Sequence, residues 1–561
     1  MRDAPEGVSR QEDSGVATPT FTFKSSAYGA NTFTVVDFHG MEAISSLYQF
    51  DIGLKCDEGT SIDLRDLLDG TASLTMQEGT SVMNSYSGVV ARVEQQQQAG
   101  GYNYYRVLLV PPAWKLGLNF RSAGFRGMTH PAIVELVLTN AGLTCGSAAT
   151  APNADVNTDD VVVDYPEQDF TCQYAESDLN FICRLLENLG IYFYFEDMAG
   201  SCRMVLADGL SYPNPVSIPF TDPSSTNNYD SIVQITQQLS AAPVQVEMTG
   251  YDYQNVSTAV QGDYGVQVDN FVPTGTYPAT WLYDHRVPDA AHAARLAQVR
   301  AQESACQACT YIGSGAIPSL RAGSTFILNS HPAAAFNREY LVTSVTHTAR
   351  NADQSWAAGS YTSSQTATGA YYGNSFTAMP VVAGQGGTAG GGNSSPNMQF
   401  RPQRVTPKPR ISGVLSAWVY LQPDTSQNPN TQGSNSQNND PQSAQITPQQ
   451  PIPGFQNTGA GDGQENAYGL PAPPMDEQGR YLVTLPFVDG SVPDSSFVSA
   501  WIRMAQPSAG LYTGTQFMLE PGAEVLLTFV NGDPDLPVIT GAVYNGATNA
   551  PLTSAATDPT L

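Results

Sequence analysis

Two cysteines three residues apart, Cys306 and Cys309, are the first candidates for chemistry in this 561-residue chain. On a helix this spacing puts both thiols on one face, where they could supply two ligands to zinc. A zinc site needs two further ligands, and no second CxxC or CxxH motif accompanies the pair. We therefore favour small buried cysteines on an alanine-rich helix over a metal site, and we expect no cofactor.

Acid–base and nucleophilic catalysis have little support in the sequence. His285 and His292 each lie close to an aspartate, but histidines scattered over turns and solvated surfaces are far more common than acid–base groups. A nucleophilic serine would need a GxSxG turn between a strand and a helix, and none occurs. Acidic pairs such as residues 159–160 are typical of solvated loops, although so acidic a chain leaves glycan cleavage by paired carboxylates open. We expect no enzymatic activity.

Composition and charge narrow the class of partner. The chain has 24 Lys and Arg against 51 Asp and Glu, a net charge of −27 that repels nucleic acid and acidic membrane surfaces. Only 13% of the residues are charged, and Gly, Ser, Thr, Asn and Gln fill the shortfall, as is typical of strands, turns and neutral protein surfaces. No window approaches about 18 consecutive apolar residues, so we expect no stable membrane insertion. Seven scattered cysteines favour folding in a reducing cytoplasm.

Short runs of alternating apolar and polar residues dominate the chain from residue 21 and predict antiparallel strands. Helix patterns are fewer: one begins at Thr129, a clearer one follows Asp178, and an alanine-rich one covers residues 289–307. The predicted fold class is therefore mainly β with a few helices.

Shifts in composition predict the domain boundaries. Residues 383–400 are almost all small and polar, as in a flexible linker, and residues 422–474 are a Gln/Asn-rich tract that predicts a disordered or loosely packed loop. The predicted order begins with a flexible tail (1–20), two β-rich regions (21–240 and 241–382) and the linker (383–400). A C-terminal β domain (401–545) and a second tail (546–561) follow.

The C-terminal β domain predicts five strands, which indicate a small closed barrel of the oligonucleotide/oligosaccharide-binding (OB) type. Asn531 and Gly532 predict a tight hairpin turn with a positive φ at the glycine. A nucleic-acid-binding barrel would need a basic groove, and residues 479–545 offer only Arg480 and Arg503. The candidates for the barrel core are Val525, Leu527, Phe529, Val538 and Ile539.

Long blocks of the sequence resemble the VgrG spike proteins of type VI secretion systems, which are similar to phage tail hub and spike proteins. The resemblance to the OB barrel of that family lies in residues 476–487 (DEQGRYLVTLPF) and 514–545 (GTQFMLEPGAEVLLTFVNGDPDLPVITGAVYN). The segment that leads into the family's barrel is matched by residues 404–413 (RVTPKPRISG). The two hub regions resemble residues 176–196 (ESDLNFICRLLENLGIYFYFE) and 337–347 (NREYLVTSVTH).

Two further residues, Trp501 and Arg503, resemble family positions in the barrel, and the sequence assigns them neither to the core nor to a trimer contact. The resemblance implies a homotrimer in which phage-hub-like β-barrel domains, 21–240 and 241–382, precede the OB-fold spike domain. Such a trimer would sit on the hexameric inner tube of a contractile injection machine, puncture target envelopes and carry effectors.

The implied partners are the inner-tube protein, baseplate proteins, a PAAR-type tip protein and effectors. The implied location is the bacterial cytoplasm during assembly and the outside of the cell after contraction. In residues 546–561 we expect no β-helix needle of the kind that usually follows the barrel in this family, and loop 422–474 is longer than the resemblance predicts, which makes it a candidate docking surface.

Three other functions remain open at this point. The nearest is the hub and spike of a phage tail or of an extracellular phage-like injection particle. Two of a different class are a secreted cell-envelope hydrolase and a surface adhesin.

Overall fold

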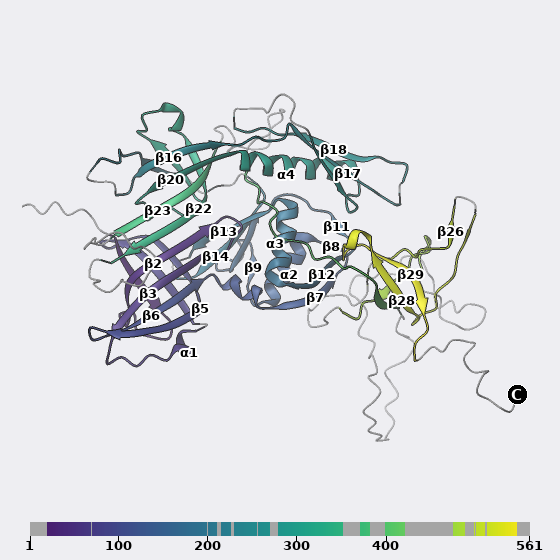
Figure 1. Ribbon diagram of the computed structural model, residues 1–561, viewed down its shortest axis with the longest axis horizontal. Coiled ribbons are helices and arrows are strands. Elements are labelled where there is room, and N and C mark those ends of the chain that lie inside the picture. The colour runs from purple at the N-terminus through teal and green to yellow at the C-terminus, as the bar shows by residue number, and fades with distance from the viewer. Residues whose placement is uncertain are drawn as a thin grey trace, which may run out of the picture. The chain divides into compact units, whose positions relative to one another are not determined.

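A computed structural model describes residues 19–351, 371–381, 399–420, 475–487 and 499–546, with gaps at 69, 199, 210–211, 213–214, 226–228, 255, 270–278, 500 and 511–512 (Figure 1). The predicted tails, linker and long loop lie wholly or largely outside these residues. The chain forms two compact units, which are residues 1–115, 141–164 and 183–405, and residues 116–140, 165–182 and 406–561.

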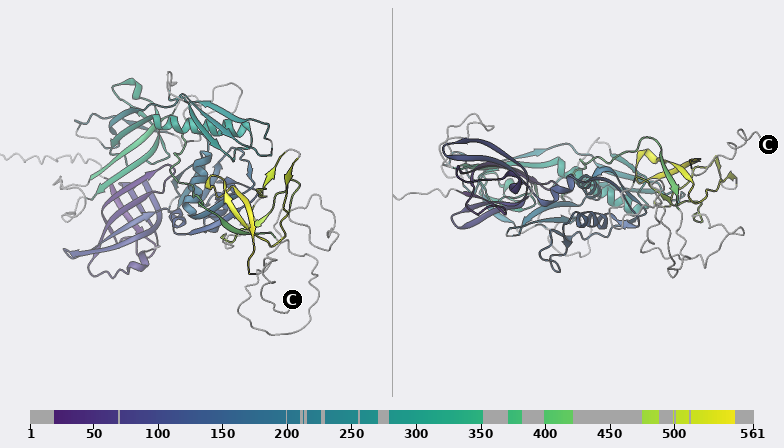
Figure 2. Two further views of the ribbon diagram at one scale, coloured as in Figure 1. Left: turned by 45° about the vertical axis from the view of Figure 1, so that its right-hand side comes forward. Right: turned by 90° about the horizontal axis from the view of Figure 1, so that it is seen from below.

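The first unit is built on a 12-stranded sheet among the described residues, in the order β1-β4-β5-β6-β3-β2-β22-β23-β20-β16, with β15 paired to β21 and β21 to β22. In the second view of Figure 2 its N-terminal strands, coloured purple, curl round one another. Side chains alternate between buried and exposed along β1, β2 and β4, as the alternating sequence runs predict. The strands are β1 (Thr20–Ser25), β2 (Thr34–Ala43), β3 (Gln49–Asp57), β4 (Thr71–Glu78), β5 (Ser81–Ala99), β6 (Tyr102–Val110), β15 (Val216–Pro219), β16 (Ile232–Leu239), β20 (Cys309–Gly315), β21 (Thr325–Asn329), β22 (Glu339–Arg350) and β23 (Tyr371–Pro380).

One strand pairing unites the two predicted β-rich regions. β2 runs antiparallel to β22, with Ala43 opposite Ser344 and Asp37 opposite Arg350. The predicted boundary at residue 240 also falls between β16 and its hydrogen-bonded partner β20. The two regions therefore share one continuous sheet.

The remaining elements of the first unit form two smaller sheets and a long helix. The alanine-rich helix α4 lies along β17 and β18 (Figure 1), and a Cβ on Gly262 of β18 would collide with the backbone of Ala294. Small residues on both elements therefore allow the close approach. The sheets have the orders β13-β14-β10-β9 and β18-β17-β19. The elements are α1 (Leu64–Leu67), β9 (Cys145–Gly146), β10 (Val156–Asp160), β13 (Tyr192–Asp197), β14 (Cys202–Ala207), β17 (Gln245–Gly250), β18 (Val260–Gly265), β19 (Thr280–Asp284), α4 (Ala290–Ala308) and η2 (Ala334–Phe336).

The second unit joins two short strand pairs and helix α2 to the C-terminal barrel. Thr129 caps α2, because its hydroxyl accepts a hydrogen bond from the Ala132 amide. Helix α3 starts at Asp178, one residue before the predicted start, and Gly190 follows its end with φ +76°. The elements of this unit outside the barrel are β7 (Phe120–Phe125), β8 (Met128–Thr129), α2 (His130–Asn140), β11 (Glu167–Gln168) and β12 (Thr171–Ser177). Two elements cross the division between the units: η1 (Pro112–Gly117) and α3 (Asp178–Leu189) each have most of their residues in the first unit.

The C-terminal barrel closes through isolated bridges as well as strands. Its sheet has the order β25-β24-β28-β29, and residues 502–504 connect the two edges through the bridges Tyr481–Ile502 and Met504–Ile539. One of the five strands that the sequence predicts for this domain covers residues 516–519, and it is wrong, since that segment has no strand structure and β26 pairs with β27 before it. The elements are β24 (Leu415–Val419), β25 (Val483–Thr484), β26 (Ser508–Ala509), β27 (Gly514–Thr515), β28 (Glu524–Phe529), η3 (Val530–Gly532) and β29 (Pro537–Val543).

The chain is thus mainly β with a few helices. No helix among the described residues is long and apolar enough to cross a membrane.

Candidate functional site

The residues predicted for the barrel core lie on β28 and β29. Val525, Leu527, Phe529 and Ile539 are buried in one cluster, which also takes Phe170 and Cys172 from the same unit. The prediction that Val538 belongs to the core is wrong, because its side chain is only partly buried. Neighbouring residues of a strand point to opposite faces, so Ile539 occupies the core and Val538 faces outward.

The predicted turn at Asn531 and Gly532 has the expected backbone but a different length. Asn531 has φ 54° and Gly532 has φ 73°. The connection from β28 to β29 spans residues 530–536 rather than two residues, because the Leu536 amide bonds to the Asp533 carbonyl and the Val530 amide to the Leu536 carbonyl. The predicted tight hairpin is therefore a longer connection made of two consecutive turns.

Trp501 and Arg503 flank Ile502, which is 2% exposed. Trp501 is half-buried and the Arg503 side chain is exposed. The Arg503 carbonyl accepts a 3.0 Å bond from the Ile539 amide and so helps to close the barrel. A trimer contact at these two residues remains a proposal.

Cys306 and Cys309 lie on different elements, and their thiols contact different partners. Cys306 is on α4 and its thiol donates to the Gln399 carbonyl at 3.1 Å, whereas Cys309 begins β20 and its sulfur lies 3.9 Å from Gln237 Nε2. Burial raises the pKa of Cys306 to about 12, which opposes the thiolate that zinc requires. Within the described part of the chain, no three His, Cys, Asp or Glu side chains gather as metal ligands.

The histidines and acidic pairs of the sequence have local roles. The Asp289 carboxylate caps α4 by accepting from the His292 amide at 2.9 Å, and it also contacts that imidazole at 2.7 Å. His285 Nδ1 lies 3.0 Å from the Tyr283 hydroxyl. Asp159 accepts from the Ala148 amide at 2.8 Å.

A buried arginine that the sequence did not single out organises the first unit. Arg401 lies in residues 399–405, here called the strap, and is 5% exposed. Its guanidinium donates to Gln302 Oε1 on α4 at 2.8 Å, to the Gly190 carbonyl at 2.8 Å and to the Asp208 carbonyl at 3.0 Å. One side chain therefore connects the strap, α4 and the ends of α3 and β14.

A second buried arginine extends this cluster along α4. Arg300, 3% exposed, donates to Glu303 at 2.9 Å and to the Glu187 carbonyl at 3.2 Å. Glu303 in turn accepts from the strap amide of Arg404 at 3.2 Å, and Glu187 accepts from the amide of Val405 at 3.0 Å. Burial first, and then the charge of Arg404, lower the pKa of Arg300 to about 10. The sequence gives one signal near these contacts: residues 401–410 (RPQRVTPKPR) form a basic run interrupted by prolines, which predicts extended chain but not the buried arginine.

The second unit has a similar connection. Asp535, in the turn before β29, accepts from the Cys172 amide at 2.6 Å and pairs with Lys408, which also pairs with Asp533. Residues just after the strap are thus held to the barrel by two carboxylates. The arginine cluster of the first unit and the Lys408 cluster of the second each fasten one segment of the chain to its neighbours. Among the described residues, neither cluster places a reactive group next to a substrate cavity.

The shared sheet, the strap of buried arginines and the closed OB barrel define a class of protein, the baseplate hub with an attached spike domain. Residues 41–353 match the family model described as "Phage tail baseplate hub (GPD)", and the chain belongs to that family. Residues 474–544 match the "Type VI secretion system/phage-baseplate injector OB domain".

Two curated relatives align with nearly the whole chain. The "Actin cross-linking toxin VgrG1" of Vibrio cholerae is 24% identical over 554 residues, which are 96% of this chain and 42% of that protein. The "Type VI secretion system spike protein VgrG5" of Pseudomonas aeruginosa is 25% identical over 537 residues, which are 92% of this chain and 57% of that protein. The chain therefore spans about half the length of these two relatives.

One solved structure shares the fold over almost its full length. The E. coli c3393 protein, described as a component of the type VI secretion system with structural similarity to the phage T4 tail proteins gp27 and gp5, aligns with a TM-score of 0.57. The identity is 18%, and the alignment covers 93% of this chain and 99% of that chain. The resemblance to VgrG spikes that the sequence indicated is confirmed by the family models and the relatives.

Proposed function

We propose that this chain is the homotrimeric hub and spike of a type VI secretion-like contractile injection system, which punctures target envelopes and carries effectors. The observation that carries the proposal is the order of the two family matches along one chain, with the hub at 41–353 followed by the injector OB domain at 474–544. The P. aeruginosa relatives are named as spike proteins of that system, which supports the same activity here.

The proposed activity is mechanical and not enzymatic. A spike that is pushed through an envelope must transmit force without unfolding, and buried charge-assisted hydrogen bonds resist separation of the elements they join. Arg300 and Arg401 supply such bonds between α4, α3 and the strap. The residues considered for catalysis have structural roles instead, such as the Asp289 cap of α4.

The proposed partners are two further copies of this chain, the hexameric inner-tube protein, baseplate proteins, a PAAR-type tip protein and effectors. Assembly in the bacterial cytoplasm and translocation on contraction belong to the same proposal. The hub regions 21–240 and 241–382 are retained as proposed domains that share one sheet, with 383–400 as the linker to the spike domain at 401–545.

The first test is the solution mass of the purified chain by light scattering, over a range of concentrations and at two salt concentrations. Salt screens the repulsion between copies that each carry −27, so a mass of three chains should persist or strengthen as salt is raised. A chain that stays monomeric in both salts and does not bind the cognate inner-tube protein would contradict the proposal. Release of sugar or peptide fragments from cell-wall material would favour a hydrolase instead.

A further inference from the structure

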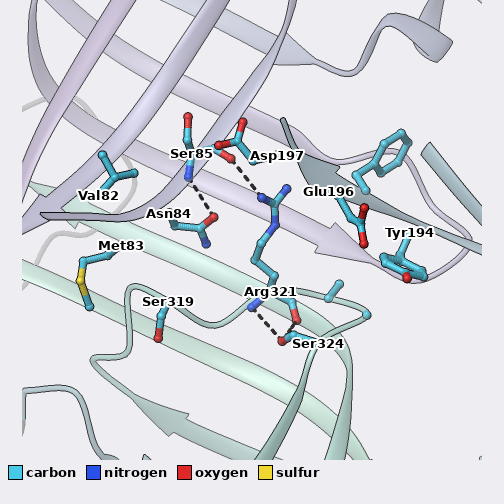
Figure 3. A pocket seen from close by; sticks show the side chains of 13 residues that line it. Val82, Met83, Asn84, Ser85, Tyr194, Glu196, Asp197, Ser319, Arg321 and Ser324 are labelled. Atoms are coloured by element: carbon cyan, nitrogen blue, oxygen red, sulfur yellow. Dashed lines mark hydrogen bonds between the residues drawn. The ribbon is translucent and has the colours of Figure 1, made fainter. Parts of the chain in front are cut away.

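A cavity of about 410 Å³ opens in the first unit (Figure 3). Three segments line it: residues 82–85 at the start of β5, residues 194–197 at the end of β13, and residues 319–324 before β21. Its volume is within the range of about 300–1,000 Å³ that is typical of small-molecule sites. The walls are mixed, with aromatic and aliphatic side chains from β13 and β5 beside serines of the third segment.

Arg321 and Asp197 both line this cavity. Figure 3 shows Arg321 reaching from the third segment toward Asp197 and Ser85. Its guanidinium donates to the Ser85 carbonyl at 3.1 Å and lies 4.5 Å from the centre of the Tyr86 ring. Burial raises the pKa of Asp197, and the nearby charge of Arg321 opposes that rise.

Both charged groups have buried atoms without a partner. Nε of Arg321 and Oδ1 of Asp197 are shielded from solvent, and neither has a hydrogen-bond partner among the described residues. The two side chains carry opposite charges, but they form no ion pair with each other in the described part of the chain. Leaving a buried polar atom unpaired costs about 1–3 kcal/mol, so each such atom needs an explanation, and a bound molecule or water is one.

The arrangement of charge decides which class of small molecule fits. A simple anion would approach Arg321 but would meet Asp197, the neighbouring Glu196 and a chain of net charge −27. A simple cation would meet the guanidinium. A zwitterion satisfies both sides, because its carboxylate can accept from Arg321 while its ammonium donates to Asp197.

We propose that this cavity binds a free α-amino acid with an apolar or aromatic side chain, with its carboxylate on Arg321 and its ammonium on Asp197. The side chain would pack against Tyr194 and the aliphatic residues Val82 and Met83, which line the same cavity. Because the lining comes from both hub regions, the ligand also cross-links β5 and β13 to the segment before β21. This site is independent of the proposed mechanical function.

The test uses the full chain and isothermal titration calorimetry with a matched set of probes. L-phenylalanine and L-leucine are the zwitterions, L-phenylalaninamide lacks the carboxylate, and N-acetyl-L-phenylalanine lacks the ammonium. We expect saturable binding of a zwitterion, with at least about tenfold weaker binding of each capped analogue, because each loses one charge-assisted contact. The bound zwitterion should also raise the thermal midpoint of unfolding.

Replacing Arg321 would disturb the fold, because its guanidinium also bonds to Ser85 and stacks on Tyr86. Asp197→Asn is therefore the deciding variant. We expect Asp197→Asn to weaken binding about tenfold or more, while Asp263→Asn on the exposed side of β18 leaves it unchanged. The proposal is overturned if neither zwitterion gives saturable heat up to about 10 mM, a range that includes millimolar dissociation constants. Equal affinity of L-phenylalanine for the wild type and Asp197→Asn would overturn it as well.

Discussion

His347 Nε2 lies 3.1 Å from Glu42 Oε1, and the two side chains are 0% and 5% exposed. They are on β22 and β2, the strands whose pairing unites the two predicted β-rich regions, and they are diagonal neighbours because Glu42 is opposite Val345. The Tyr86 hydroxyl donates to the same carboxylate oxygen at 2.8 Å, and the Tyr372 hydroxyl lies 2.8 Å from His347 Nδ1. This buried network specifies the register of β2 against β22, because a slip would leave each polar group without its partner.

Replacing His347 should destabilise the hub more than the small size of the imidazole side chain suggests. His347→Ala leaves the Glu42 carboxylate buried with one hydrogen bond fewer, so we expect the free energy of unfolding to fall by about 2–4 kcal/mol. The measurement is chemical denaturation followed by circular dichroism. His39→Ala on the exposed side of β2 is the matched control, and equal stability of the two variants would mean that the network is not an important source of stability.

The network shows what the sequence could and could not predict. The alternation in residues 340–348 predicts a strand, and β22 is one. The pattern does not show that His347 is fully buried, because its partners Tyr86 and Glu42 come from 261 and 305 positions away. Period-two alternation reports a face of a strand, whereas the satisfaction of a buried polar group depends on the tertiary fold.

Arg401 is expected to be the most sensitive residue of the strap. Arg401→Ala would leave the Gln302 side chain and the Gly190 and Asp208 carbonyls without this donor, so we expect a loss of about 3 kcal/mol or more. Arg401→Lys should not restore stability, because an ammonium lacks the planar fork that reaches several acceptors.

The matched control for the strap is Arg410→Ala, since Arg410 is exposed nine residues further along the same basic run. Limited proteolysis adds a second measurement, because release of the strap should expose its backbone to cleavage. Strap cleavage at the same rate in Arg401→Ala and Arg410→Ala would show that Arg401 does not hold the strap.

The turn between β28 and β29 should reject a β-branched residue. Gly532 has φ +73°, and an added Cβ would lie 3.3 Å from the Ile411 carbonyl oxygen, so Gly532→Val should lower the free energy of unfolding of the barrel by about 1–3 kcal/mol. Gly541→Val is the control, because a Cβ there has open space around it on β29. A thermal midpoint for Gly532→Val at or above that of Gly541→Val would contradict the assigned backbone.

This turn also marks a limit of sequence reasoning. The positive φ predicted at Gly532 is present, since local backbone preference decides it, and Asn531 has a positive φ as well. The length of the connection is set by the bond from the Leu536 amide to the Asp533 carbonyl and by the pairing of Asp535 with Lys408. The second of these contacts is remote in sequence, so the dipeptide carries no signal for it.

Three cysteines whose thiol pKa is raised should resist alkylation in the folded protein. Burial raises the pKa of Cys183 and Cys306 to about 12 and that of Cys202 to about 11. At pH 8 a thiol of pKa about 12 is thiolate in roughly 1 of 10⁴ molecules, so labelling by iodoacetamide should be slow until the chain unfolds. Mass spectrometry of labelled peptides, with guanidinium-unfolded protein as the control, measures this. Fast labelling of Cys306 in the native state would show that its thiol is accessible and ionised.

The same thiols predict a loss of stability in alkali. Their ordinary pKa is 9.0, so between about pH 9 and 11 the unfolded chain releases protons that the folded chain keeps. The folded state then binds more protons, and stability falls as pH rises, by up to about 1.4 kcal/mol per pH unit for each thiol. Unfolding at pH 8, 9 and 10 should show this slope, and the double variant Cys183→Ala and Cys306→Ala should have a shallower one. If the two proteins lose stability in parallel above pH 9, other buried groups such as the tyrosines must cause the loss.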